Sequence, residues 1–242
     1  MINDHHKRPI FIGYDSREPE AYTVCARSIL HHAFGKVDIF PLKSDHLRRL
    51  GIYRRASYMD EDQLWEDQRG EQHSTEFTFT RYLVPALMNW RGWALFCDGD
   101  FLFRESVSDV FGMADDRYAV MCCRRPSYRP VDTSKMFGQR VAQNQYERKN
   151  WSSFVLWNCS HPANQELTPY RVNHSRKSFL HGFAWLEDDE IGALPMEWNW
   201  LEGEGDEGEP KAVHFTRGIP SLPGYEKSEY SDEWFAYLHG AR

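Results

Sequence analysis

Short apolar runs and amphipathic segments alternate over the first part of the chain. The apolar run at residues 9–14 ends in Asp15 and Ser16, which predicts a buried strand followed by a turn. Apolar residues then recur at helical spacing over residues 18–33, and residues 37–42 form a second short apolar run. A strand, a helix and a strand in this order make a βαβ unit with a parallel sheet, whose ligands gather at the carboxyl ends of the strands. The pattern therefore predicts an α/β fold.

Later segments continue the alternation and predict a single domain over residues 1–242. Further strands are predicted at residues 93–97, 118–123, 154–158, 191–194 and 212–216, and helices at residues 107–113 and 230–238. Residues 53–73 are polar and predict a long loop, and residues 74–76 predict the start of a helix that places Arg81 opposite its apolar face. The acidic, glycine-punctuated residues 202–209 predict an exposed, mobile loop, because such a segment buries too little apolar surface to offset its ordering entropy.

Composition and charge narrow the class of protein. The net charge of −7 argues against a general nucleic-acid binder, which would present a basic face. The cysteines lie mostly in apolar runs: Cys25, Cys97, Cys122, Cys123 and Cys159. Their odd number and the lack of a Cys-x-x-Cys spacing predict reduced core thiols. No apolar stretch follows Met1 and no run approaches the length of a membrane span, so we expect a cytoplasmic protein without a transmembrane segment.

Two aspartates stand where the predicted strand at residues 93–97 ends. The chain continues Asp98-Gly99-Asp100 and then turns apolar again. Burying carboxylates is costly unless they are paired or bind a metal, and a hard divalent cation is the usual partner. With 17 Asp in 242 residues, chance alone predicts roughly one Asp-x-Asp, and the polar segment 60–62 contains another. The position at the end of a buried strand therefore carries the signal, not the tripeptide itself.

Other candidate residues are weak signals when each is taken alone. His214 lies in an apolar run, where a single histidine is more often a satisfied core residue than a ligand. Arg81 on a helix face is most often a solvated charge. Gly13 and Tyr14 after the first strand lack the repeated glycines of a dinucleotide-binding motif.

Taken together and in this order, the motifs resemble the GT-A glycosyltransferases, specifically the family 8-like group, and most closely a set of poorly characterised bacterial and phage members. The resemblance covers roughly residues 9 to 240 and is carried by residues 11–18, 74–77, 81–85, 96–103, 148–153, 194–199 and 214–216. It implies a mostly parallel, Rossmann-like sheet flanked by helices. It also implies a flexible N-terminus at residues 1–8, a nucleotide-binding half at residues 9–103 and a sugar- and acceptor-binding half at residues 104–242.

The resemblance implies roles for individual residues. A divalent cation, Mn²⁺ or Mg²⁺, would be held by Asp98, Asp100 and His214, and the imidazole nitrogen favours Mn²⁺. The nucleotide would contact Gly13, Tyr14, Asp15, Arg17, Arg81 and Arg217. The donor sugar and the acceptor would contact Lys149, Asn150, Trp151, Ser152, Ser153, Trp185, Trp198 and Asn199.

The chain departs from the family pattern at two places. The usual acidic motif of the catalytic region is not recognisable where residues 181–185 stand, so the catalytic group stays open, with His181, Asp188 and Asp189 as candidates. Gly218 follows His214 by four residues, not three, and the expected lysine is absent.

The implied function is a metal-dependent transfer of a hexose from a nucleoside-diphosphate sugar, a UDP-sugar in the first place, to a glycan, glycolipid or cell-surface acceptor. Family analogy favours retention of configuration at the sugar. One alternative is a nucleotidyltransferase or nucleotide-sugar pyrophosphorylase, which needs a glycine-rich triphosphate loop with a lysine that residues 13–17 lack. A second alternative is a non-catalytic sugar-binding module, in which tryptophans bind and Asp98 is structural.

Overall fold

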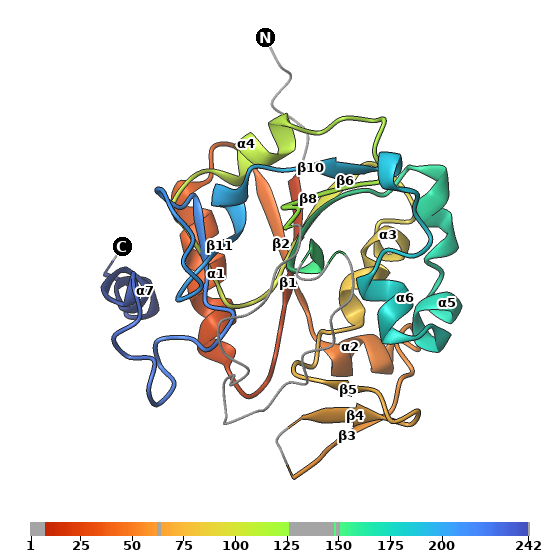
Figure 1. The fold of residues 1–242 in the computed structure, drawn as a ribbon, viewed down its shortest axis with the longest axis horizontal. Helices are drawn as coiled ribbons and strands as arrows, with labels where there is room; N and C mark the ends of the chain where they lie inside the picture. Colours follow the sequence, from red (N-terminus) through yellow and green to blue (C-terminus); the bar gives the residue numbers. More distant parts are fainter. Residues whose placement is uncertain (1–7, 62–63, 126–147, 149–150, 242) are drawn as a thin grey trace.

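The computed structural model describes residues 8–61, 64–125, 148 and 151–241 (Figure 1). A central six-stranded sheet has the order β10-β8-β9-β6-β1-β2. Its strands are β1 (Arg8–Gly13), β2 (Val37–Leu42), β6 (Trp93–Cys97), β8 (Val120–Cys122), β9 (Phe154–Asn158) and β10 (Ile191–Ala193). β1 is parallel to β2 and β6, and β10 is parallel to β8, whereas β9 is antiparallel to both of its neighbours. The predicted α/β fold with a mostly parallel central sheet is confirmed.

A smaller, three-stranded sheet contains β7 (Phe101–Phe103), the strand that follows β6 in the sequence. It has the order β11-β12-β7, and its other strands are β11 (Trp200–Leu201) and β12 (Ala212–His214). The helix α1 (Pro19–His32) packs between the two sheets: Cys25 and Ile29 join the apolar core of the large sheet, while Ala21 and Val24 join that of the small one. The C-terminal helix α7 (Ser231–Leu238) covers α1 from outside.

The remaining elements are short. The α-helices are α2 (Ser44–Arg49), α3 (Val84–Leu87), α4 (Val107–Gly112), α5 (Pro169–His174) and α6 (Lys177–His181). The 3₁₀ helices are η1 (Thr80–Leu83), η3 (Trp151–Ser153), η4 (Pro162–Glu166), η5 (Asp188–Glu190) and η6 (Met196–Asn199). The predicted helix beginning at residues 74–76 is therefore wrong: two short helices follow one another at residues 80–87.

The polar segment 53–73 is not a loop throughout, as the sequence predicted. It contains β3 (Ser57–Met59), β4 (Trp65–Asp67) and β5 (Gln72–His73), which form a third, antiparallel sheet. These strands are two or three residues long, too short for an alternating apolar pattern to emerge.

Two further expectations meet the structure here. All five cysteines are buried free thiols, as predicted. Residues 1–7 of the expected flexible terminus lie outside the described residues, and Arg8 already belongs to β1. Among the described helices, none is both long and apolar enough to cross a membrane.

Candidate active site

The pairing of β7 with β12 brings three candidate metal ligands together. Asp98 and Asp100 lie in the turn between β6 and β7, and Phe101 at the start of β7 pairs with His214 at the end of β12. His214 Nε2 lies 3.2 Å from Asp100 Oδ1. One ligand atom from each of the three side chains lies within 4.8 Å of the others. The ring of Phe101 stacks on the imidazole, with 4.3 Å between the ring centroids, and fixes its plane.

The hydrogen bonds around His214 suit a metal ligand. His214 Nδ1 lies 2.8 Å from Asn199 Oδ1, and the amide nitrogen of Asn199 donates to Ser153 Oγ at 2.9 Å. The amide oxygen can only accept, so Nδ1 carries the proton. Nε2, which faces Asp100 Oδ1, is then the ring nitrogen that could bind a metal. That oxygen is buried and receives no hydrogen bond from the described residues. A ring nitrogen and a carboxylate oxygen that face each other in this way can hold a cation between them, and carboxylate and imidazole ligands fit Mn²⁺ or Mg²⁺.

Arg81 is buried beside this cluster, with 5% of its surface exposed. Its Nη1 lies 2.9 Å from Asp98 Oδ1 and donates to the carbonyl oxygen of Ser152, also at 2.9 Å. The guanidinium lies 5.3 Å from the ring centroid of Phe77 and 5.0 Å from that of Phe96. The expectation of an exposed helical arginine is therefore wrong, because η1 and α3 do not form one continuous amphipathic helix with a solvent face.

Hydrogen bonds connect the 3₁₀ helix η3 to the same cluster. The backbone N–H of Asp98 donates to the carbonyl oxygen of Ser153. Ser152 Oγ lies 3.0 Å from His181 Nδ1, so His181 is linked through Ser152 to Arg81. Burial, followed by the positive charge of Arg81, holds the pKa of His181 well below its ordinary value, and its Nε2 is buried without a described hydrogen-bond partner. The structure thus brings four predicted residues, Ser152, Ser153, His181 and Asn199, to the metal candidates.

Glu18 belongs to this neighbourhood and was not singled out from the sequence. It precedes α1, is 4% exposed, and its Oε2 has no hydrogen-bond partner among the described residues. Burial, and then the negative charges of Asp100 and Asp15, raise the pKa of Glu18 well above its ordinary value. The only signal in the sequence was its place at the end of motif 11–18, where an acid at a helix N-terminus has an ordinary structural explanation.

The candidate nucleotide contacts at the end of β1 have structural partners of their own. The carboxylate of Asp15 receives hydrogen bonds from the backbone and guanidinium of Arg17 and from the backbone N–H of Glu76. A Cβ at Gly13 would lie 2.5 Å from the ring of Phe77, so this position is closely packed. The ring of Tyr14 is half-buried, and the ammonium group of Lys43 lies over it, 4.3 Å from the ring centroid. Their roles toward a nucleotide stay predictions.

Several other predicted residues lie elsewhere. Trp198 is fully buried and stacks on Phe154, so it is not an acceptor surface as predicted. The half-buried Trp185 stacks on Trp157 and donates to Asn164, and the indole N–H of Trp151 donates to the carbonyl oxygen of Arg125. Lys149 and Asn150 lie outside the described residues.

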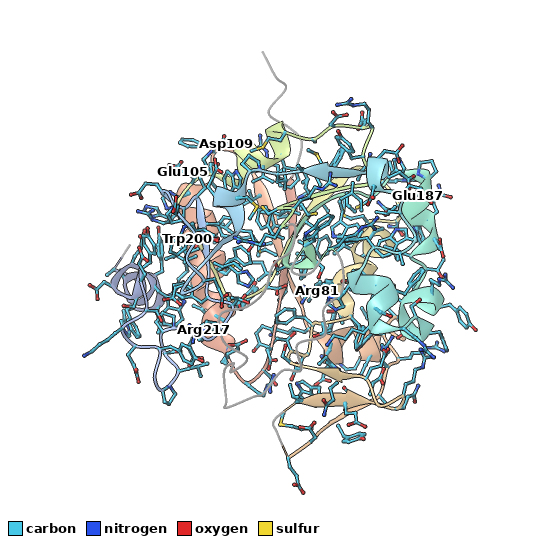
Figure 2. The ribbon with its side chains drawn as sticks, viewed as in Figure 1. Arg81, Glu105, Asp109, Glu187, Trp200 and Arg217 are labelled. Carbon is cyan, nitrogen blue, oxygen red and sulfur yellow. The ribbon has the colours of Figure 1, made fainter. Side chains whose placement is uncertain are left out.

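The remaining two acidic candidates for catalysis are on the surface. Asp188 and Asp189 lie in η5, both exposed, and Asp188 forms an ion pair with Arg148 at 2.6 Å. In Figure 2, Glu187, immediately before them, lies toward the right edge of the molecule, and Arg81 lies near its centre. Of the three candidates, only His181 lies in the buried network.

The acidic loop (residues 202–209) is largely exposed, as the sequence predicted, but Asp206 anchors it to the fold. Arg125 Nη1 lies 2.7 Å from Asp206 Oδ1, and the backbone N–H of Leu201 donates to the same carboxylate. Arg125 also donates to the carbonyl oxygen of Asn199 at 2.7 Å. Arg217 lies against this loop, since a Cβ at Gly203 would be 3.1 Å from its Nη1. A cavity of about 610 Å³ lies between the loop and the segment that contains Arg125.

Comparison with solved structures identifies the fold. The WbbM bifunctional glycosyltransferase superposes with a TM-score of 0.62 and 14% identity over 97% of this chain and 50% of its own. GlyE, a glycosyltransferase of Streptococcus pneumoniae TIGR4, superposes with a TM-score of 0.60 and 13% identity, covering 97% of this chain and 60% of GlyE. The galactosyltransferase LgtC superposes with a TM-score of 0.53 and 9% identity, covering 96% of this chain and 95% of LgtC. The chain thus spans about half of WbbM, and its fold is the GT-A fold of glycosyltransferases.

Comparison of sequences identifies the family. No protein-family model matches the chain. Protein CDI of Arabidopsis thaliana is 44% identical over 236 residues, which cover 94% of this chain and 85% of that protein. Identity at this level over nearly the whole length means that the chain belongs to the same family as Protein CDI.

Proposed function

We propose that the protein is a metal-dependent glycosyltransferase that uses a nucleoside-diphosphate sugar. The observation that carries the proposal is the convergence of Asp98, Asp100 and His214 at the end of β6 within a GT-A fold. A bound divalent cation would supply Lewis-acid stabilisation for the negative charge of a diphosphate leaving group. Mn²⁺ is the favoured ion because one donor is an imidazole nitrogen.

The residues around the cluster position its donors. Arg81 occupies one oxygen of Asp98 and so fixes the orientation of that carboxylate. Asn199 fixes the tautomer of His214, and Ser153 fixes Asn199 in turn. Such partners orient a metal ligand, and the amide oxygen that accepts from His214 Nδ1 also raises the basicity of Nε2. The chain's own contribution is thus a cation site whose donors are held in place before the donor substrate arrives.

The finer parts of the proposal come from the sequence resemblance. They are a UDP-hexose donor, a glycan or glycolipid acceptor, retention at the sugar and a place near the family 8-like group. His181 remains the candidate for a catalytic role, because it alone among the three candidates lies in the buried network.

Ligand-dependent thermal stability tests the proposal. A panel of UDP, other nucleoside diphosphates and their sugars is measured with and without Mn²⁺, for the wild type, Asp100→Asn and the control Asp109→Asn, which changes an exposed residue of α4. We expect Mn²⁺-dependent stabilisation by one nucleotide in the wild type and in the control, about 2.7 kcal/mol at a ligand concentration of 100 Kd. Asp100→Asn should abolish it.

Two other outcomes would contradict the proposal. Binding of a free sugar without metal, unchanged in Asp100→Asn, would indicate a sugar-binding module. Formation of a nucleotide sugar and diphosphate from a nucleoside triphosphate and a sugar phosphate would indicate a nucleotidyltransferase.

A further inference from the structure

Glu18 stands at the start of the helix that packs against the turn with the two aspartates. A Cβ at Gly99 would lie 2.5 Å from the carbonyl oxygen of Gly13 and 3.9 Å from the backbone nitrogen of Tyr22, so this turn packs directly against the end of β1 and the first turn of α1. Glu18 stands four residues before Tyr22, and residues four apart lie on the same side of a helix. The side chain of Glu18 therefore begins on the side of α1 that meets Gly99.

Among the described residues, no capping hydrogen bond or ion pair explains a carboxylate at this position. The side chain of Glu18 makes no capping hydrogen bond to α1, although the residue occupies the N-cap position. It is 4% exposed, and Oε2 has no partner among the described residues. An unsatisfied buried polar group costs about 1–3 kcal/mol, more if it is charged. A buried carboxyl group that destabilises the fold without a partner indicates a ligand that the group serves.

In the described part of the chain, two carboxyl groups near the cluster lack a cationic side chain as a partner. Asp15 is paired with Arg17 at 2.7 Å, and Asp98 is paired with Arg81 at 2.9 Å. Among the described residues of this neighbourhood, Asp100 and Glu18 are the carboxyl groups without a guanidinium partner. Two carboxylates match the charge of one divalent cation, whose binding would remove their mutual repulsion.

We infer that Glu18 is a positioning residue of the cation site, acting on the ion from outside its direct ligands. Its carboxylate is not among the ligand atoms that lie within 4.8 Å of one another, so it acts by its charge and by hydrogen bonding to what the cation carries, not by direct ligation. The inference rests on the proposed function, because it presumes a divalent cation between Asp100 and His214.

Mn²⁺ titration without nucleotide tests this role directly. Calorimetry and the Mn²⁺ paramagnetic resonance signal give the Kd for the wild type, Glu18→Gln and the control Glu20→Gln, an exposed residue of the same helix. Loss of an outer partner typically weakens metal binding by about 10- to 100-fold, and we expect this for Glu18→Gln. Glu20→Gln should bind like the wild type. Glu18→Asp, which keeps the charge, should bind more tightly than Glu18→Gln.

Melting without metal separates this role from a structural one. Glu18→Gln removes a buried acid beside Asp100, so we expect its metal-free melting temperature to equal or exceed that of the wild type. A lower metal-free melting temperature with an unchanged Kd would overturn the inference. Asp100→Asn separates failure of the proposed cation site from failure of the proposed role of Glu18. If Asp100→Asn abolishes Mn²⁺ binding while Glu18→Gln leaves the Kd unchanged, only the role of Glu18 is contradicted. If Asp100→Asn binds Mn²⁺ like the wild type, the cation site fails, and the inference fails with it.

Discussion

Arg81 shows how one side chain connects the packing of the core with the candidate active site. Its guanidinium pairs with Asp98 and bonds the carbonyl oxygen of Ser152, while its faces lie against two phenylalanine rings. These contacts hold the ends of β6 and η3 together. A buried arginine with these partners has a structural role, so we expect its substitution to change folding as well as any binding at the candidate site.

Arg81→Met is expected to lower the free energy of unfolding by about 3–5 kcal/mol, because it removes one partner of a buried ion pair and leaves the other uncompensated. Urea unfolding at neutral pH measures the loss. Arg117→Met is the control, since Arg117 also pairs with an aspartate but with an exposed side chain. Little change is expected there. Equal stability of Arg81→Met and the wild type would mean that the ion pair is not formed.

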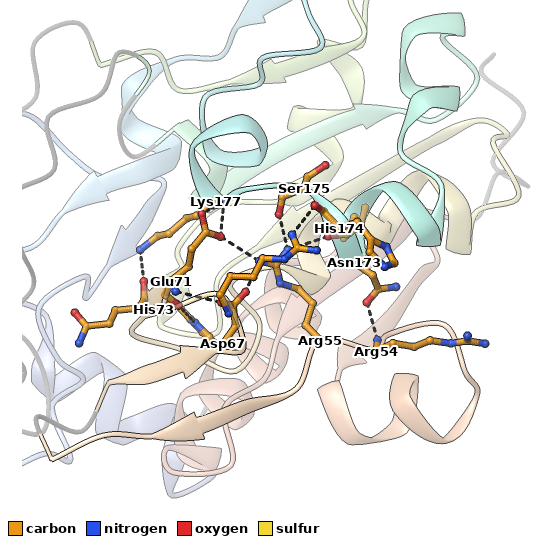
Figure 3. A network of polar contacts seen from close by, with 12 residues as sticks. Arg54, Arg55, Asp67, Glu71, His73, Asn173, His174, Ser175 and Lys177 are labelled. Carbon is orange, nitrogen blue, oxygen red and sulfur yellow. Dashed lines mark hydrogen bonds and ion pairs between the residues drawn. The ribbon is translucent and has the colours of Figure 1, made fainter.

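At the scale of elements, the small β3-β4-β5 sheet is held by a network of polar contacts (Figure 3). Arg55 is 2% exposed and pairs with Asp67 at 2.5 Å and with Glu71 at 3.1 Å. The same guanidinium donates to the carbonyl oxygen of Ser175, between α5 and α6, and Glu71 accepts from the backbone N–H of Lys177. Partners more than a hundred residues away in sequence stabilise these strands, and a local pattern in residues 53–73 cannot show this.

Arg55→Met is expected to detach the small sheet from α5 and α6 while the central sheet stays folded. The loss of its buried charge leaves two carboxylates without their common partner, at a cost on the order of 3 kcal/mol. Hydrogen exchange should then be faster at the β4 amides and unchanged at β1 and β6. Arg54→Met is a control one residue away with an exposed side chain, and it should exchange like the wild type. Uniform acceleration over the whole chain would contradict a local role.

Over the whole molecule, the sequence predicted the elements whose residues form one apolar run. β2 and β9 have the predicted limits, and α1 differs from its prediction by one residue at each end. β9 is buried throughout and α1 buries one helical stripe, whereas β2 is mostly half-buried and was predictable from its run of apolar residues alone. The strand direction of β9 was not predictable, since its apolar run does not depend on which neighbour it pairs with. The third sheet depends on polar contacts between residues far apart in the sequence, and the local pattern of apolar residues therefore did not predict it.

The candidate site was predictable to a similar degree. The carboxylates of Asp98 and Asp100 stand at a strand end that periodicity predicts. The role of His214 as a metal ligand was predicted from the family resemblance alone, because the sequence of neither strand shows that β12 pairs with β7. Glu18 and the burial of Arg81 depend on how the turn at Gly99 packs against α1 and how η1 folds, which are properties of the tertiary structure.

The stability of the whole molecule should depend on pH through His73, which is 3% exposed and packs against Phe79. Burial lowers the pKa of His73 from 6.5 to about 4 in the folded state. Between pH 4 and 6.5 the unfolded chain binds a proton at His73 that the folded chain does not. The contribution of His73 to stability is therefore complete above pH 6.5 and is lost as the pH falls toward 4, by about 1.4 kcal/mol per pH unit.

Urea unfolding at pH 7, 6 and 5 should show a shallower decline in the free energy of unfolding for His73→Gln than for the wild type. The exposed His46 is the control, and His46→Gln should keep the wild-type slope. Comparing each variant with the wild type cancels the opposing contribution of buried acids such as Glu18, whose raised pKa lowers stability as the pH rises. Equal slopes for the two variants would show that His73 is protonated to the same extent in the folded and unfolded chains.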